Sequence, residues 1–228
     1  MKVGLGTFTC DQHPDDDRPH AELYKEMIDL AQVAEANNFD SAWVSEHHFT
    51  EGGYSPSVTS MLASLATATD DLEIGSNVAL GPLYKQPVRL AEDLAVIDHL
   101  AEGRLTFGVA NGYRVAEFEA MDIPLDERPL RLTHLVKILK KAWQDDELVH
   151  DGHERLDSAW EFDGVSVTPD PYQEDGPDII LGGFAPKAVE RAAHIADGYS
   201  TGALTGFDMA LDCAETYWNA VEETNKDP

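Results

Sequence analysis

Two kinds of hydrophobic pattern alternate along the chain. Short apolar runs rich in Val, Ile and Phe, such as residues 104–110, are typical of buried strands. Longer segments repeat their apolar residues with the period of one helix face, as at Leu23, Met27, Leu30, Ala31 and Ala34. Strands that alternate with helices favour βα units and a parallel sheet. The predicted strands are residues 3–6, 41–45, 72–79, 104–110, 178–181 and 198–201.

Proline and glycine mark several boundaries of the intervening helices. In Ser55-Pro56 a capping residue precedes proline at the first helical position, so a helix is predicted to begin there. Pro87 begins the next helix and Gly103 ends it. Later helices are predicted from residues 186 to 196 and 207 to about 223. Between residues 113 and 177 the pattern predicts one helix, over 131–143, and polar loops elsewhere.

These elements predict a single α/β domain over residues 1–228, a TIM-type (β/α) barrel in which about six of the eight βα units are present. Either the barrel is shortened or the chain is a fragment. Asn225-Lys226-Asp227-Pro228 resembles the turn before another strand, which favours truncation at the C-terminus. An open barrel exposes a strand edge, and we therefore expect a homo-oligomer.

Acidic residues greatly outnumber basic ones, 43 to 16, which gives a formal net charge of -27 and a pI near 4.4. Such a surface repels phosphate backbones and anionic lipids, so nucleic-acid and membrane partners are not expected. Salt would screen the self-repulsion, which favours a halophilic source over a merely acidic mesophilic one. No apolar run approaches the roughly 20 residues of a membrane helix and residues 1–5 do not resemble a signal peptide, so a cytoplasmic location is expected.

The first strand end with candidate chemistry is residues 46–51, Glu-His-His-Phe-Thr-Glu. Neighbouring strand residues point to opposite sides, so His47 and His48 are not expected to bind one metal ion. Glu46 and His48 share a side, which leaves a metal site and structural hydrogen bonding as further interpretations. A histidine beside a bound substrate suits proton transfer, because the unperturbed pKa of its side chain, about 6.5, lies near working pH.

Three further strand ends carry small, polar or cationic residues. Residues 75–82 have glycines that let a flat ligand approach the backbone. Asn111 can donate to or accept from a ligand, and Arg114 can supply a bidentate cation to a phosphate or remain solvated at the surface. Gly182 and Gly183 precede a predicted helix N-terminus, where free N–H groups bind phosphate, although a plain βα turn has the same pattern.

In this order the segments resemble the bacterial luciferase family, also called luciferase-like monooxygenases. The resemblance extends over essentially all 228 residues. The segments that carry it are residues 46–51, 86–93, 100–104, 112–114 with Glu117-Phe118, 182–183 and 196–198.

The resemblance implies an enzyme that uses reduced FMN and O₂ to oxidise a small organic substrate, with a separate flavin reductase as partner. By position, His47 matches the catalytic histidine and His48 is its neighbour, and both are predicted to be catalytic residues. Ala110 and Asn111 stand where luciferase has cysteine and arginine, so the phosphate contact there is altered and light emission is not expected.

The cofactor-binding residues implied by the resemblance lie on the later strand ends. Asn77 and Val78 match a cis peptide bond packed on the flavin ring. Gly182, Gly183 and Phe184 match the phosphate-binding turn, and Asn111 and Arg114 complete the predicted set. The seventh and eighth strands of the family are missing, which would leave part of the flavin pocket open.

Three other functions compete with the monooxygenase. The deazaflavin F420 would support hydride transfer without oxygen in the same fold. A non-catalytic flavin-binding protein is the second alternative. A metal-dependent hydrolase is the weakest, because His and Asp do not recur at the other strand ends with ligand spacing, and no metal is predicted.

Overall fold

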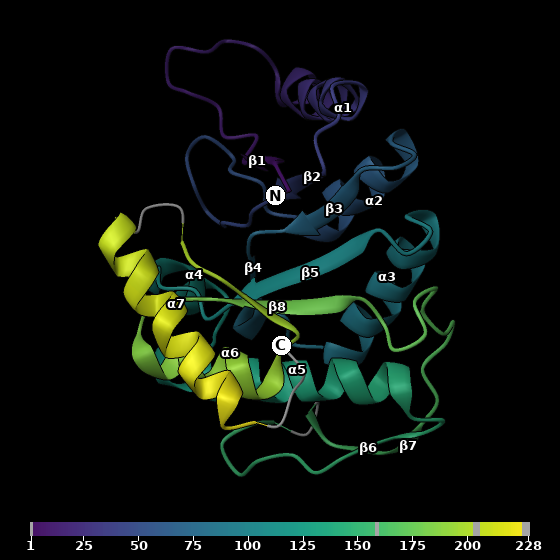
Figure 1. The fold of residues 1–228 in the computed structure, drawn as a ribbon, viewed down its shortest axis with the longest axis vertical. Helices are drawn as coiled ribbons and strands as arrows, with labels where there is room; N and C mark the ends of the chain where they lie inside the picture. Colours follow the sequence, from purple (N-terminus) through teal and green to yellow (C-terminus); the bar gives the residue numbers. More distant parts are fainter. Residues whose placement is uncertain (1, 158–159, 203–205, 225–228) are drawn as a thin grey trace.

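The computed structural model describes residues 2–157, 160–202 and 206–224. Within them a parallel sheet curls into a half-barrel, with the strand order β1-β2-β3-β5-β8-β9 and β4 beside β5 (Figure 1). Every strand of this sheet runs parallel to its neighbours, so six consecutive βα units are confirmed. The strands are β1 (Gly4–Phe8), β2 (Ser41–Val44), β3 (Glu73–Ser76), β4 (Ala79–Leu80), β5 (Leu105–Ala110), β8 (Asp178–Gly182) and β9 (Gly198–Ser200).

Helices cover the convex face of the sheet, where the main core lies. Alternate strand residues such as Phe107, Val109 and Ile179 are completely buried in it, because parallel strands need apolar cover. The predicted face of the first helix is buried except for Leu30, which is exposed. The helices are α1 (His20–Ala36), α2 (Val58–Ala68), α3 (Pro87–Leu100), α4 (Val115–Ala120), α5 (Arg128–Gln144), α6 (Pro186–Ile195) and α7 (Phe207–Glu222), with short 3₁₀ turns at Gly81–Leu83 and Leu125–Glu127.

The concave face of the sheet is built from small residues around one tryptophan. A Cβ atom on Gly75 would lie 2.4 Å from Trp43 Cζ3, and one on Gly4 would lie 2.9 Å from Trp43 Nε1. The indole N–H donates to Ser41 Oγ at 2.9 Å, which fixes the ring over its own strand. Glycine is therefore required on both flanking strands, because the Trp43 ring occupies the space that side chains would need.

Two predicted boundaries are wrong near the strand ends. The helix predicted from Ser55-Pro56 begins at Val58, because Ser55 is held by the barrel instead: its N–H donates to Thr9 O at 2.8 Å and its hydroxyl to Ser45 O. The single strand predicted at 72–79 is divided into β3 and β4, and the Asn77–Val78 peptide bond between them is cis, as the resemblance implies.

The segment between β5 and β8 contains more structure than predicted. Helix α5 is longer than the predicted 131–143, and a short helix, α4, precedes it. The residues predicted as loop include an antiparallel hairpin of β6 (Leu148–His150) and β7 (Phe162–Val165). Its strands are too short to show a period of two, and the hairpin is fixed by contacts with α5, including His134 Nδ1 at 2.8 Å from His150 Nε2.

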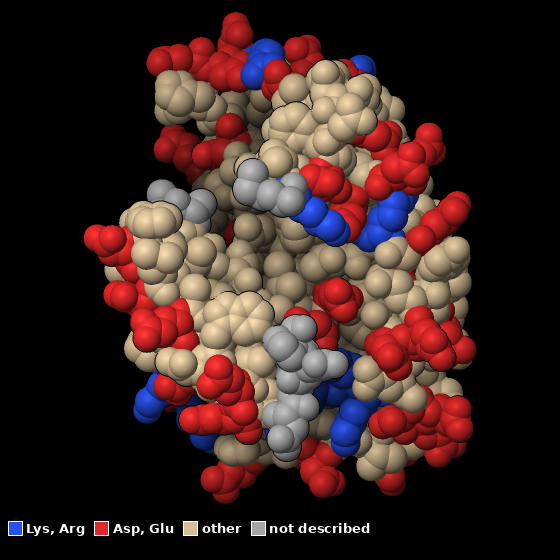
Figure 2. All heavy atoms as spheres, viewed as in Figure 1, with Lys and Arg blue, Asp and Glu red and all other residues tan. Residues whose placement is uncertain are grey.

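The first and last strands are the two edges of the described sheet. Strands β1 and β9 each pair with one neighbour, so the predicted open edge is present in the described part of the chain. The face drawn in Figure 2 is hollowed between its two ends, and acidic side chains are distributed widely over it. Residues 225–228, predicted to form a turn before another strand, lie outside the described residues.

Candidate functional site

The predicted site residues follow strands that all run in the same direction. His47 follows β2, Asn77 and Val78 follow β3, Asn111 follows β5, and Gly182 ends β8. Parallel pairing places the carboxyl ends of these strands along one edge of the half-barrel. Direct contacts join distant members of this edge: Ser200 Oγ donates to Asn77 Oδ1 at 3.1 Å, and a Cβ atom on Gly182 would lie 3.0 Å from Val78 Cγ1.

His47 is held by a carboxylate that the sequence analysis did not identify as functional. Its Nδ1 lies 2.8 Å from Oε1 of Glu117, the first-turn acidic residue of α4, which is completely buried. An ionised carboxylate only accepts hydrogen bonds, and a bond from Nδ1–H to it would leave Nε2 for a ligand. The rings of Tyr54 and Tyr113 contact the imidazole edge-on, with centroids 4.9 and 5.7 Å away. The His47 ring therefore has one defined orientation.

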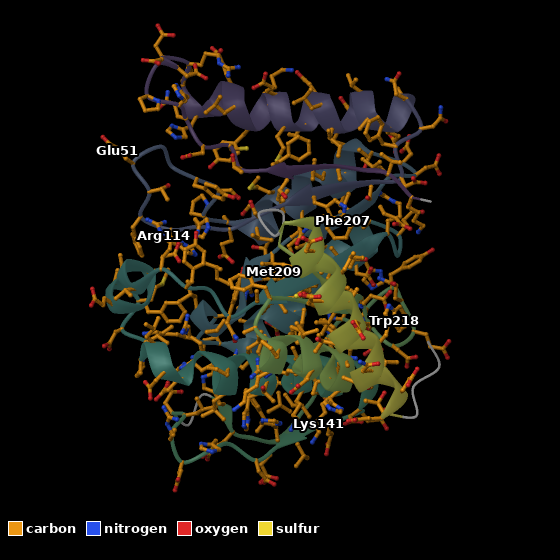
Figure 3. The ribbon with its side chains drawn as sticks, turned by 60° about the vertical axis from the view of Figure 1, so that its left-hand side comes forward. Glu51, Arg114, Lys141, Phe207, Met209 and Trp218 are labelled. Atoms are coloured by element: carbon orange, nitrogen blue, oxygen red, sulfur yellow. The ribbon has the colours of Figure 1, made fainter. Side chains whose placement is uncertain are left out.

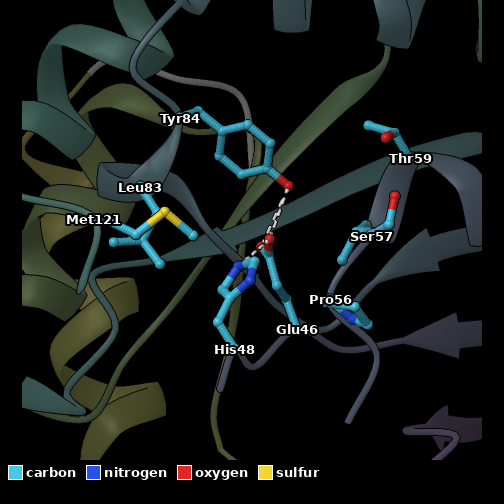
Figure 4. Close-up of a pocket in the computed structure, with 9 residues that line it drawn as sticks. Glu46, His48, Pro56, Ser57, Thr59, Leu83, Tyr84 and Met121 are labelled. Carbon is cyan, nitrogen blue, oxygen red and sulfur yellow. Dashed lines mark hydrogen bonds and ion pairs between the residues drawn. The ribbon is translucent and has the colours of Figure 1, made fainter. Parts of the chain in front are cut away.

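His48 faces a different part of the molecule. Its Nε2 lies 3.0 Å from Glu46 Oε1, so these two residues lie on the same side of the segment after β2, as the alternation predicted. The His48 ring lines a cavity of about 170 Å³ near the start of α2, and its assignment to the catalytic group stays a prediction. Figure 4 shows the His48 ring and the Tyr84 hydroxyl both directed at Glu46. Burial, together with the nearby Glu46 carboxylate, raises the Tyr84 pKa well above its ordinary value.

A surface that fits a flavin ring lies where β3, β5 and β8 end. The Asn77–Val78 peptide is next to Gly182, whose missing side chain leaves Val78 and Ala110 uncovered. Asn111 Oδ1 is buried there without a hydrogen-bond partner among the described residues. A buried amide oxygen without a partner is costly, and a ligand donor such as a ring N–H would satisfy it. The residues present therefore fit the cofactor that the resemblance implies.

The predicted phosphate turn connects β8 to α6. Gly183 has a φ of +156°, and Pro186 begins α6 without a side-chain cap on its first N–H groups. Phe184 is 65% exposed, so its ring projects from the turn instead of packing beneath it. Free N–H groups at the start of a helix suit a phosphate, but Pro186 has none and the Ala188 N–H donates to Ala185 O at 2.8 Å. The assignment of this turn to phosphate stays a prediction.

Arg114 has partners that the sequence analysis did not foresee. Its Nη1 donates to His48 O at 3.1 Å and lies 3.3 Å from Glu117 Oε1. The guanidinium thus lies beside the His48 carbonyl and the Glu117 carboxylate. Its predicted contact with a phosphate stays a prediction, whereas the contact with Glu117 is part of the structure. Arg114 is the N-cap residue of α4 and Glu117 lies in its first turn, so the pair depends on a helix that was not predicted.

Two negative findings apply to the described residues. No group of three or more His, Cys, Asp or Glu side chains among them is arranged to hold a metal ion. No helix in the described ranges is long and apolar enough to cross a membrane.

Comparison with known proteins gives a family match over residues 1–228 to the model described as luciferase-like monooxygenase. The oxygenase component of a flavin-dependent trigonelline monooxygenase from Acinetobacter baylyi is 28% identical over 78% of this chain and 48% of its own length. An FMNH₂-dependent dimethylsulfone monooxygenase from Pseudomonas putida is 32% identical over 75% and 47%. The chain thus spans about half the length of the curated relatives it matches.

Solved structures show the same fold. A monooxygenase from Streptomyces bottropensis superimposes with a TM-score of 0.89 at 26% identity, over 100% of this chain and 68% of that one. An F420-dependent secondary alcohol dehydrogenase gives a TM-score of 0.82 at 18% identity, over 100% and 66%, which shows the fold alone.

Proposed function

Because the chain belongs to the luciferase-like monooxygenase family, we propose that it carries the flavin site of an enzyme that uses reduced FMN and O₂ to oxidise a small organic substrate. One observation carries the proposal: an imidazole held at 2.8 Å by a buried carboxylate, His47 with Glu117, lies on the strand-end edge that also contains the orphaned Asn111 oxygen. The pair supplies a proton-transfer group, and the edge supplies a cofactor surface.

In this proposal the residues divide into those that bind the cofactor and those that act on protons. Asn111 and the Gly182-Gly183 turn would hold the ring and the phosphate. Bound reduced FMN supplies the electrons that activate molecular oxygen. His47 would hold or deliver a proton at Nε2, and Tyr54 and Tyr113 would limit access of water to that nitrogen.

Oxygen chemistry is the test of the proposal. The chain is mixed anaerobically with reduced FMN, and isotopically labelled ¹⁸O₂ is added with aldehydes, alkanes, dimethylsulfone or trigonelline. We expect one labelled organic product above the background of free flavin oxidation. Hydride transfer from reduced F420 to a carbonyl without oxygen uptake would instead assign the alternative cofactor. Tight flavin binding without any product would identify a non-catalytic flavoprotein.

A separate flavin reductase and a cytoplasmic location belong to the same proposal. Free reduced flavin is oxidised by O₂, so a monooxygenase of this type needs a reductase that makes it continuously. The relatives named above as an oxygenase component and as FMNH₂-dependent support this division of labour. Turnover should therefore begin when a flavin reductase and NADH are added to the chain with oxidised FMN.

Replacing Asn111 by leucine should weaken FMN binding without lowering the stability of the fold. Its buried Oδ1 has no partner in the described residues, so an apolar side chain of similar volume should leave the free energy of unfolding unchanged or raise it by up to about 1 kcal/mol. FMN affinity should fall about tenfold, which corresponds to roughly 1.4 kcal/mol. Flavin fluorescence titration and urea unfolding measure the two effects. Unchanged affinity would remove Asn111 from the cofactor site.

Salt adaptation is proposed from the charge. With a formal net charge of -27 spread over the surface, self-repulsion should destabilise the folded chain at low ionic strength. Raising KCl from about 0.01 M to 1 M shortens the screening length from roughly 30 Å to 3 Å, so the thermal midpoint should rise by several degrees. Differential scanning calorimetry measures this. A midpoint that does not rise with KCl would argue against a halophilic source.

A homo-oligomer is proposed from the exposed apolar surface beside the open edge. Helix α7 follows β9 and exposes Phe207, Met209 and Trp218, which Figure 3 labels along one helix. Phe207 is 77% exposed, and side chains of this kind are buried in most interfaces. Light scattering at high salt, where charge repulsion is screened, should show a mass above 25.0 kDa.

A further inference from the structure

Glu117 accepts from three groups, two in the segment after β2 and one at the start of its own helix, α4. Its Oε1 accepts from His47 Nδ1 at 2.8 Å, from the His48 backbone N–H at 2.9 Å and from Arg114 Nη1 at 3.3 Å. The residue is completely buried, and Oε2 has no partner among the described residues. Burying a carboxylate costs free energy, which hydrogen bonds and a nearby positive charge can offset. Here all the partners among the described residues reach one oxygen, so the buried charge of Glu117 depends on those three groups.

We propose that Glu117 is a positioning residue, which fixes His47 as the Nδ1–H tautomer and directs the unprotonated Nε2 to the reacting groups. This rests on the proposed function only for the role of His47 in turnover. The tautomer follows from geometry, because an ionised carboxylate cannot donate to Nδ1. Arg114 supplies the positive charge that stabilises the carboxylate in its buried position.

A purely structural role for Glu117 makes a different prediction. Its bond to the His48 N–H fixes α4 to the end of β2, so any substitution would cost stability. A structural anchor would leave the tautomer of His47 unchanged when the carboxylate is lost. A positioning residue would not, because a neutral imidazole without this acceptor is free to carry its proton on Nε2.

Substitutions distinguish three roles of Glu117: hydrogen-bond acceptor, negative charge and structural anchor. Glu117→Gln keeps an oxygen at the position of Oε1 and removes the charge. Glu117→Leu removes both the acceptor and the charge. Glu127→Gln is the matched control: Glu127 is also buried and accepts from Arg131 Nε at 2.9 Å, but it has no contact with His47.

The tautomer is measured by two-bond ¹H–¹⁵N correlation spectra of the flavin-free chain labelled with ¹⁵N-histidine. His47 is assigned by the signal that His47→Gln removes. We expect Nδ1–H for His47 in the unsubstituted chain, in Glu117→Gln and in Glu127→Gln, and a shift to Nε2–H in Glu117→Leu. An Nε2–H signal from the unsubstituted chain overturns the proposal, as does Nδ1–H in Glu117→Leu. The first of these outcomes does not depend on whether a variant folds.

Kinetics add a second, independent measurement. Glu117→Leu should lower kcat at least tenfold with KM for the organic substrate within about twofold, because the residue orients His47 and does not touch the substrate. Glu127→Gln should change neither parameter by more than twofold. Because the spectra are recorded without flavin, the expected tautomer with no oxygen consumed would reject the monooxygenase and leave the positioning role intact. Oxygenation by a chain whose His47 is the Nε2–H tautomer would support the monooxygenase and reject the positioning role.

Discussion

Replacement of His47 by alanine is expected to lower turnover with reduced flavin by about 10² to 10⁴, the usual contribution of a positioned acid–base group. The imidazole is the only ring in the described structure that combines a buried carboxylate partner with a position at the strand ends beside Tyr54 and Tyr113. Its side chain is 19% exposed, so truncation leaves a small space open to water. Product formation under single-turnover conditions measures the effect on the chemical step.

The comparison with His48 makes this result specific. His48→Ala removes the neighbouring ring, which contacts Glu46 on the other side of the strand, so turnover should fall by less than tenfold. The thermal midpoint should fall more for His48→Ala, because Glu46 loses a buried partner. Equal losses of turnover in the two variants, with equal flavin affinity, would contradict the assignment of His47 as the proton-transfer group.

Replacement of Gly108 by alanine should cost more stability than any other single methyl group added to the sheet. A Cβ atom there would lie 1.9 Å from the carbonyl oxygen of Ser76, and Ser76 Oγ already donates back to Gly108 O at 2.7 Å. The obstacle is backbone in the neighbouring strand, which no side-chain rotation can relieve. We expect a loss of more than about 3 kcal/mol in the free energy of unfolding, the upper end for overpacked interiors.

The control for Gly108 is the same chemical change in open space. A Cβ atom on Gly206 would meet nothing within 4 Å, so Gly206→Ala should stay within about 0.5 kcal/mol of the parent in urea unfolding. Because β3 ends at Ser76 and leads directly into Asn77–Val78, a shifted β3 should also weaken FMN binding in any Gly108→Ala protein that folds. A Gly108→Ala chain as stable as the parent would disprove the close approach of β3 and β5.

Much of the site was predictable because parallel strands place their ends together. His47, Asn77, Val78, Asn111 and Gly182 were assigned from strand ends and family resemblance, and the structure places all five on one edge. The alternation of strand side chains also predicted that His47 and His48 point to opposite sides. The role of each residue could not be derived, since the partners of His47 and Arg114 include residues that are distant in the chain.

The sequence by itself determined the order of six βα units and the edge where chemistry can occur. Each buried strand or helix face requires apolar residues at a regular spacing, and this spacing can be read locally in the sequence. Only the tertiary structure decided which groups meet there. Glu117 is 70 residues from His47 along the chain, the start of α2 is set by Ser55 bonding to the barrel, and the β6–β7 hairpin depends on α5. Contacts of this kind leave no local period, since they arise from the packing of segments that are distant in sequence.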